Sequence, residues 1–372
     1  MLALARLCYI GSLLLVLVLW GLGNSASAQS NRTLDVQRFR PAFDDAGFIG
    51  LDGTRTLPPY RFAFTLAMDL AIDPVELELD GDEYEPLEER FVTHLAAEMG
   101  LLGRLNVALY LPLIVHQQGE ILPMQADDLD AFAVGDPEIA LRYRFLGVNM
   151  AERDAPRDGP GLALQLSASV PVGTKDAYAG EGAVRTEAAL LGDFQLLGAG
   201  AGASLGWRHH FRDAPDDGLP KHDEFTFAVG LKLPLPPLPE LIPVLEFRGA
   251  TAFEAHTTAL ELGLGVNGNF GDVILTLAGS VGLSDGYGTP DGRVVLGVRW
   301  SPSESDKDGD GIDDSKDQCP YLAEDPDGFN DSDGCPDPDN DNDLIPDLDD
   351  RCPDEQAEEG RDEDEDGCTD PK

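Results

Sequence analysis

The chain has 372 residues and a formal net charge of −43, which is enough length for two or three domains. So acidic a protein is excluded as a partner of nucleic acid phosphates, whereas cations are natural partners. After the first thirty residues, no stretch approaches the roughly 18 apolar residues of a membrane helix, so any membrane contact must be made by strands.

Residues 1–28 read as a secretory signal peptide. Arg6 gives the segment a basic start, Leu13 to Leu22 form an apolar run, and Ala26-Ser27-Ala28 is a small-residue cleavage site. The mature chain is therefore predicted to be exported and to begin at Gln29.

Residues 29–58 carry several large apolar side chains without a long periodic pattern. These residues are Phe39, Phe43, Phe48, Ile49 and Leu51. We predict a periplasmic lead-in that packs at the mouth of the β domain that follows.

Residues 59–302 are dominated by strict alternation of apolar and small or polar residues. In the first run Phe62, Phe64, Leu66, Met68, Leu70 and Ile72 alternate with Arg61, Ala63, Thr65, Ala67, Asp69 and Ala71. This period of two is typical of strands, and the pattern returns often enough to predict about twelve of them.

The second face of these runs mixes small residues with charges, which a soluble sandwich would not normally place inside. Such charges include Glu138, Arg142, Arg144, Glu246 and Arg248. We therefore predict an all-β fold with an antiparallel transmembrane barrel, lipid outside and a polar lumen inside.

Four aromatic residues near strand ends are expected to form a girdle at the lipid headgroups: Tyr110, Trp207, Tyr287 and Trp300. The alternative is that they are ordinary buried aromatics of a soluble β domain. An even number of strands brings both barrel ends to one side, so the tail is expected in the periplasm.

Residues 303–372 contain 29 acidic and 5 basic residues, a net charge of −24. Carboxylates recur in a fixed register, and each set of aspartates precedes a cysteine at the same offsets 33 residues apart. Calcium accepts six to eight oxygen ligands in relaxed geometry, so this spacing favours calcium over magnesium. The candidate metal ligands are Asp306, Asp308, Asp310, the carbonyl of Ile312, Asp314, Asp317, Asp331, Asp333, Asp339, Asp341, Asp343, the carbonyl of Ile345, Asp347 and Asp350.

The second unit departs from the first at one turn. Leu344 stands where the first unit has Gly311, and a positive φ angle would strain a residue other than glycine. The second calcium site is therefore expected to be weaker or reshaped.

This pattern of aspartates with alternating Cys-Pro and Gly-Cys steps resembles the thrombospondin type 3 repeat, a calcium-binding family. The resemblance covers about Asp306 to Asp370. We expect Cys319 to pair with Cys335 and Cys352 with Cys368, although four cysteines allow three connectivities and a Cys335–Cys352 bond is the main competitor.

A signal peptide, an alternating β domain and such repeats together resemble the OmpA-type outer-membrane proteins. Those proteins continue into a peptidoglycan-binding domain, and we expect that domain to be absent here. No nucleophile, base and orienting group converge in the sequence, so we predict no catalytic site and no enzyme.

The leading functional hypothesis is a Gram-negative outer-membrane structural protein. Its periplasmic calcium-binding spacer would connect the membrane with the wall or with partner proteins of the envelope. One alternative is an outer-membrane diffusion channel, motivated by the charged lumen. Another is a secreted calcium-dependent adhesin whose β domain is soluble.

Overall fold

The computed structural model describes two units of the chain. Its described residues are 35–44, 48–79, 82–119, 129–147, 159–174, 177–197, 199–211, 223–235, 238, 240–253, 257–302, 308, 310, 312, 316–357, 361 and 366–369. The predicted signal peptide lies outside them. None of the described residues form a helix of the length and apolarity needed to cross a membrane.

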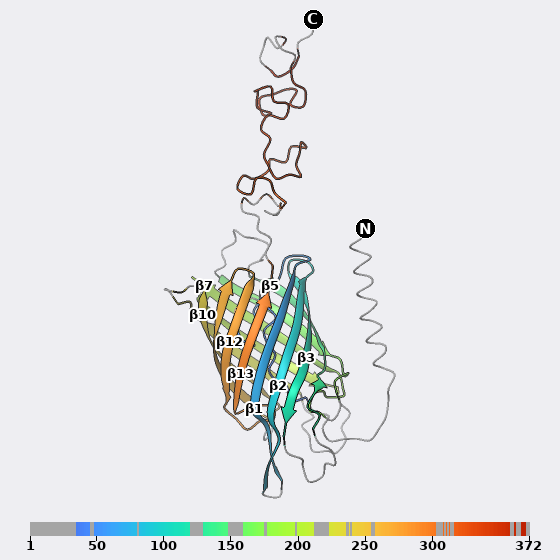
Figure 1. Ribbon diagram of the computed structural model, residues 1–372, viewed down its shortest axis with the longest axis vertical. Coiled ribbons are helices and arrows are strands. Elements are labelled where there is room, and N and C mark those ends of the chain that lie inside the picture. The colour runs from blue at the N-terminus through green and yellow to red at the C-terminus, as the bar shows by residue number, and fades with distance from the viewer. Residues whose placement is uncertain are drawn as a thin grey trace. The chain divides into compact units, whose positions relative to one another are not determined.

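The first unit is an antiparallel β-barrel (Figure 1). Its strands are β1 (Phe62–Leu79), β2 (Asp82–Gly100), β3 (Leu105–Gln118), β4 (Ala133–Val134), β5 (Glu138–Leu146), β6 (Gly159–Ser169), β7 (Arg185–Leu196), β8 (Ala199–His210), β9 (Glu224–Lys232), β10 (Leu241–Thr251), β11 (Ala259–Phe270), β12 (Val273–Gly282) and β13 (Gly292–Trp300). The two-residue β4 lies beside β3, and the other twelve described strands close the wall because β1 pairs with both β2 and β13. The prediction of about twelve strands in an antiparallel barrel is confirmed.

Alternation along each strand separates an apolar exterior from a polar interior. On β1, Phe64 and Leu66 are 47% and 40% exposed, whereas Ala63 before them and Asp69 after them are 0% exposed. The lumen-facing charges expected from the sequence are buried inside, including Glu138, Arg142 and Glu246. Closure leaves no unpaired sheet edge along the wall.

The two ends of the barrel have different connections. At the end where β13 finishes, the links are residues 101–104, 147–158, 197–198, 233–240 and 271–272; we call this the short-turn end. The opposite end carries 119–137, 170–184, 211–223, 252–258 and 283–291 and is called the long-loop end, although its β1–β2 turn is tight.

The segment from residue 35 to 58 is called the plug, and its described residues, 35–44 and 48–58, are mostly buried against the inner wall and form no strand of the sheet. Val36 hydrogen-bonds to Tyr178 in a long loop, whereas Thr56 donates to the carbonyl of Gly103 in a short turn. The described residues of the plug therefore reach from one end of the lumen to the other. We expected this segment to pack at the mouth of the barrel. It lies in the lumen instead, because the wall offers charges that pair with the plug and small residues that leave space for its side chains.

Two of the four expected girdle aromatics lie inside instead. Trp207 and Trp300 are half-exposed on the outer face, as expected. Tyr110 is 6% exposed in the lumen, and the Tyr287 hydroxyl donates to Glu224 at the long-loop end. The expectation was wrong for these two because nearness to a strand end does not decide which face a side chain occupies.

The second unit spans Ser303–Lys372 and contains turns but neither strand nor helix among its described residues. Disulfides join Cys319 to Cys335 and Cys352 to Cys368, with Cα–Cα distances of 5.0 and 5.3 Å. The expected pairing within each repeat is confirmed.

Candidate functional site

The plug is fixed to the wall at its centre by Glu246 of β10. Its carboxylate, which is 1% exposed, accepts hydrogen bonds from the backbone N–H groups of Ile49, Gly50 and Leu51 at 3.0–3.1 Å. It also pairs with Arg248 at 3.0 Å. A carboxylate with several backbone donors and a cation is well satisfied even when buried.

A second polar cluster holds the plug toward the short-turn end. Arg142 of β5 contacts Asp44 and Asp52 of the plug, each at 3.0 Å, and Asp52 also pairs with Arg40 at 2.7 Å. On β7, Asp193 accepts from the N–H and the hydroxyl of Thr54. The plug is thus bound through side chains rather than through a strand ladder.

At the long-loop end, arginines and carboxylates alternate between plug and wall. Arg38 pairs with Glu224 at 2.8 Å and stacks over the ring of Tyr287 at 4.1 Å. Asp35 pairs with Arg185 at 3.0 Å. A cavity of about 160 Å³ remains beside these residues, between the plug and the wall.

Aromatic side chains of the plug fill space that small wall residues leave open. A Cβ added at Gly202 or Gly230 would lie 2.8 or 2.6 Å from the ring of Phe48, so glycine at these lumen positions admits the ring. Phe39 lies under Arg248 and Arg293 and meets His94 edge-on.

His94 belongs to a buried group that sequence reasoning missed. Its Nε2 lies 2.5 Å from Asp69, its Nδ1 lies 2.7 Å from the Tyr110 hydroxyl, and Arg293 also pairs with Asp69. Strand register explains the meeting, because β1 and β2 pair residue 69 with 92 and residue 67 with 94. In the sequence His94 is 25 residues from Asp69 and 16 residues from Tyr110, and these separations give no spacing signal.

The described residues of the loop 170–184, which are 170–174 and 177–184, fold inward over the plug, and Asp136 holds them. The two carboxylate oxygens of Asp136 accept from the N–H groups of Gly173 (2.7 Å) and Glu181 (3.0 Å). Burial, together with the nearby carboxylate of Asp35, raises the pKa of Asp136 to about 6, against the opposing effect of these two hydrogen bonds and of Arg185.

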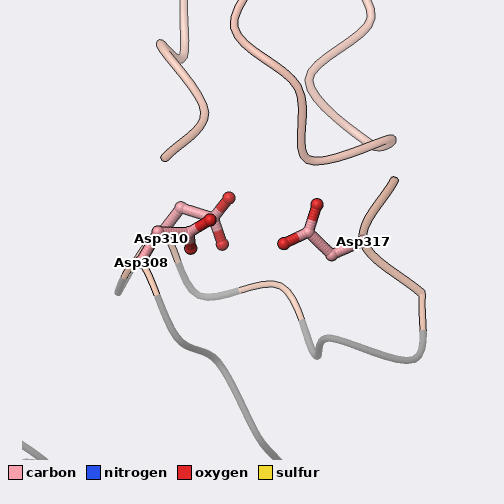
Figure 2. A group of neighbouring side chains, drawn as sticks. All are labelled: Asp308, Asp310 and Asp317. Atoms are coloured by element: carbon pink, nitrogen blue, oxygen red, sulfur yellow. The ribbon is translucent and has the colours of Figure 1, made fainter. Parts of the chain in front are cut away.

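In the tail, Asp308, Asp310 and Asp317 turn their carboxylates toward a common centre (Figure 2). One oxygen from each lies within 4.8 Å of the others. Both oxygens of Asp308 are shielded from solvent and have no hydrogen-bond partner among the described residues. Shielded, unpartnered carboxylate oxygens fit a hard cation such as calcium.

The second trio is Asp339, Asp341 and Asp343, whose carboxylate oxygens meet the same 4.8 Å limit. Burial and the neighbouring carboxylates raise the pKa of Asp341, so a cation there would relieve repulsion. The loop keeps its turn at Leu344, whose φ angle is 80° and whose N–H donates to Asp339. Leucine therefore occupies the left-handed conformation that we expected to be strained.

The other described candidate aspartates belong to neither trio. Asp331 and Asp333 cap turns at Gly328 and Cys335, Asp347 accepts from Asn340, and Asp350 accepts from Cys352. Ile312 and Ile345 donate their N–H groups to Asp310 and Asp343, respectively. Asp306 and Asp314 lie outside the described residues.

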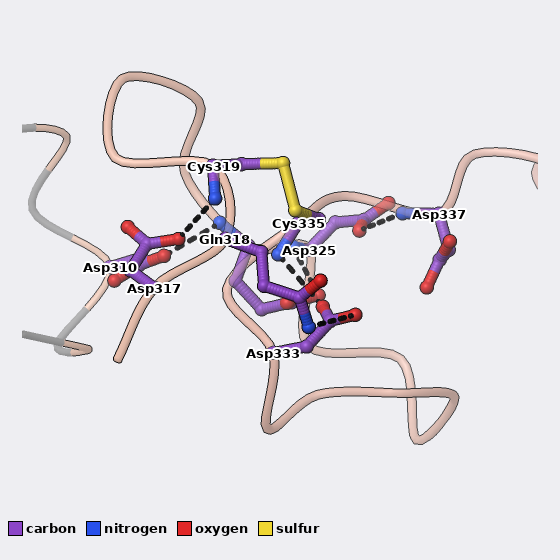
Figure 3. The surroundings of a disulfide bond; sticks show 9 residues. Asp310, Asp317, Gln318, Cys319, Asp325, Asp333, Cys335 and Asp337 are labelled. Carbon is purple, nitrogen blue, oxygen red and sulfur yellow. Dashed lines mark hydrogen bonds between the residues drawn. A yellow bond between two sulfur atoms is a disulfide. The ribbon is translucent and has the colours of Figure 1, made fainter. Parts of the chain in front are cut away.

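The Cys319–Cys335 disulfide sits among aspartates that cap neighbouring N–H groups (Figure 3). Asp317 accepts from Cys319 and Asp333 accepts from Cys335, while the Asp337 N–H donates to Asp325 within the same repeat. The sulfur bridge and the carboxylate turns therefore fix the same short stretch of backbone.

No protein-family model matches the sequence, and no curated protein matches it. Solved structures with a similar fold include an outer membrane channel from Pseudomonas putida F1, with 13% identity, a TM-score of 0.48 and coverage of 66% of this chain and 97% of that chain. The NanC porin has 6% identity, a TM-score of 0.41, and coverage of 64% and 100%. The KdgM porin has 8% identity, a TM-score of 0.38, and coverage of 65% and 99%. Because these identities are low, the fold of this chain is assigned from its own strand pairing.

Proposed function

We propose that this protein is an outer-membrane barrel whose lumen is a solute pathway closed by its own N-terminal plug. The observation that carries the proposal is the plug itself, which lies in a charged lumen and is attached there by side chains such as Glu246 and Arg142. A barrel serving only as an anchor has no need of a charged wall behind a separable segment.

The exterior supports the membrane placement. Large apolar residues cover it on successive strands, for example Phe64, Leu205, Leu264 and Leu296, at 47–65% exposure. Such a surface is stable in lipid and would aggregate in water, which disfavours the secreted adhesin. In barrels of this type short turns conventionally face the periplasm, so the tail that follows β13 is assigned there.

The test compares the full chain with a deletion of residues 36–55 that keeps the signal peptide. Both proteins are extracted in detergent and checked for a mobility shift on boiling, which reports a closed barrel. In planar bilayers we expect small or rare conductance from the full chain and a large, steady conductance from the deletion variant. A folded deletion variant without conductance would rule out the pathway.

As a second function, we propose that the tail is a calcium-binding periplasmic spacer that links the outer membrane to the wall or to envelope proteins. Two trios of carboxylates in the same register and two disulfides support it. The few apolar residues of the tail cannot offset the entropy of ordering it, so bound cations would supply stabilisation.

Calorimetric titration of the intact protein with calcium tests the spacer. Asp308→Asn and Asp341→Asn should each weaken one class of site at least tenfold, because each removes a charge from a trio. Asp349→Asn is the matched control, since Asp349 is exposed, belongs to neither trio and is not a candidate ligand, so its replacement should leave the titration nearly unchanged. Identical titrations for all four proteins would contradict the assignment.

A further inference from the structure

Arg90 of β2 is a buried cation without a carboxylate partner among the described residues. Its side chain is 1% exposed, and no described carboxylate oxygen lies within 4.0 Å of it. Its Nη2 donates to the carbonyls of Ala177 (3.1 Å) and Tyr178 (2.8 Å), while Nε and Nη1 have no hydrogen-bond partner.

The carboxylates that lie near Arg90 already form ion pairs with other cations. Asp35 pairs with Arg185 at 3.0 Å, and Asp69 contacts both Arg293 and His94. Buried arginines normally have hydrogen-bonded anionic partners, because a guanidinium has five donors and is costly to desolvate. Two neutral carbonyls on one nitrogen are a poor substitute for an anion.

The two carbonyls belong to the inward-folded loop 170–184, which lies over the plug. Tyr178 also accepts from the N–H of Val36 in the plug, and Gln117 beside Arg90 donates to the carbonyl of Ala177. Ala177 and Ala179 are 0% and 1% exposed, so the loop covers Arg90 from the long-loop end.

We propose that Arg90 is an oxyanion-binding residue, and that a solute bearing a carboxylate or phosphate opens the long-loop end by replacing the loop carbonyls. Once the loop carbonyls leave Nη2, this nitrogen and either Nη1 or Nε present two parallel N–H groups that match two oxygens of such a group. Releasing Ala177 and Tyr178 removes one anchor of the loop and leaves Asp136 as another, so the loop opens more often. Opening also breaks the contact between Tyr178 and Val36. This step rests on the proposed pathway, because it supplies the solute class that would travel through it.

The experiment follows loop opening through a single cysteine at Ala179→Cys in the full chain, where the native tail cysteines are paired. The rate of modification by a water-soluble maleimide is measured in sodium phosphate and in sodium chloride of equal ionic strength. With Arg90 present, phosphate should raise the rate several-fold. With Arg90→Gln, the rate should be raised equally in both salts, because the loop has lost one of its anchors.

Two further variants keep the result decisive. Arg104→Gln alters an exposed arginine in a short turn and should keep the phosphate response. If Arg90→Gln does not fold, Arg90→Lys takes its place. Lysine preserves the charge without the fork, so the phosphate response should be weakened. A phosphate effect absent with Arg90, or equal with and without it, overturns the proposal. The readout is independent of conductance, so a barrel that never conducts but keeps this response refutes only the pathway.

Discussion

The barrel and the tail obtain order from different parts of their sequences. The barrel pairs its backbone in a closed sheet, turns apolar residues such as Leu264 outward and buries ion pairs such as Arg142–Asp44. The tail has neither strand nor helix among its described residues, and its most apolar positions, Leu344 and Leu348, are 89% and 99% exposed. Strand pairing and, as we propose, lipid therefore stabilise one unit, whereas covalent bonds and, as we propose, cations stabilise the other.

Removal of calcium gives the largest expected effect and tests this contrast directly. With chelator, repulsion within a segment of net charge −24 should expand the tail, and amides such as those of Asp343 and Leu344 should lose protection from hydrogen exchange. Amides of the barrel strands should keep theirs. Equal protection of the tail amides with and without chelator would mean that calcium does not stabilise the tail.

Within the barrel, Glu246→Gln should loosen the plug while leaving the wall intact. The neutral amide accepts fewer of the three N–H bonds and no longer pairs with Arg248, a loss of about 2–4 kcal/mol. Open probability in planar bilayers should rise by at least tenfold. Glu88→Gln, which alters an exposed hydrogen bond with Gln118, is the control and should behave like the unaltered protein.

Gly230→Ala should displace Phe48 by steric pressure alone. Its new Cβ would lie 2.6 Å from the ring, a clash that costs about 1–3 kcal/mol to relieve. Gly263→Ala is the matched change, because the nearest atom there lies 3.6 Å away. Conductance should increase for the first variant only; equal traces would mean that the ring moves without opening the lumen.

Strand alternation was enough to predict the barrel because it is a local property. The face of the sheet that Phe64 or Asp69 occupies can be predicted from the residues one and two positions away. The disulfide pairing and the two aspartate trios were likewise foreseeable, since repeats of fixed length carry their ligands within a few residues of one another.

The plug could not be placed in the same way. Phe39 and Phe48 have no periodic pattern, and their sites on the wall are built from strands far along the chain, such as β10 around Glu246 and β13 around Val295. The useful signal was indirect: glycines such as Gly202 and Gly230 on inward-facing positions leave space that something must fill. His94, Asp69 and Tyr110 escaped for the same reason, because register and not spacing unites them.

The pH dependence of the loop over the plug follows from Asp136. Its pKa is raised to about 6 with the loop closed and would return toward 3.8 with it open, so closure is favoured at low pH and loses stability as pH rises through about 6. Between pH 5 and 7.5, opening should become roughly tenfold more favourable. Maleimide labelling at Ala179→Cys, divided by labelling at the exposed Arg104→Cys, should show this rise. With Asp136→Asn added, the ratio should be flat.

Leu344→Gly should give the smallest change and separates the two calcium loops. Leucine at a φ angle of 80° costs about 1 kcal/mol relative to glycine, so the substitution should tighten the second site about fivefold. In calorimetry on the intact protein, the calcium affinity of the second site should move toward that of the first site. Because Leu344 is 89% exposed, its side chain contributes little packing that could mask the gain. A weaker second site in this variant would mean that leucine, by restricting the unfolded loop, stabilises the turn more than its strained backbone opposes it.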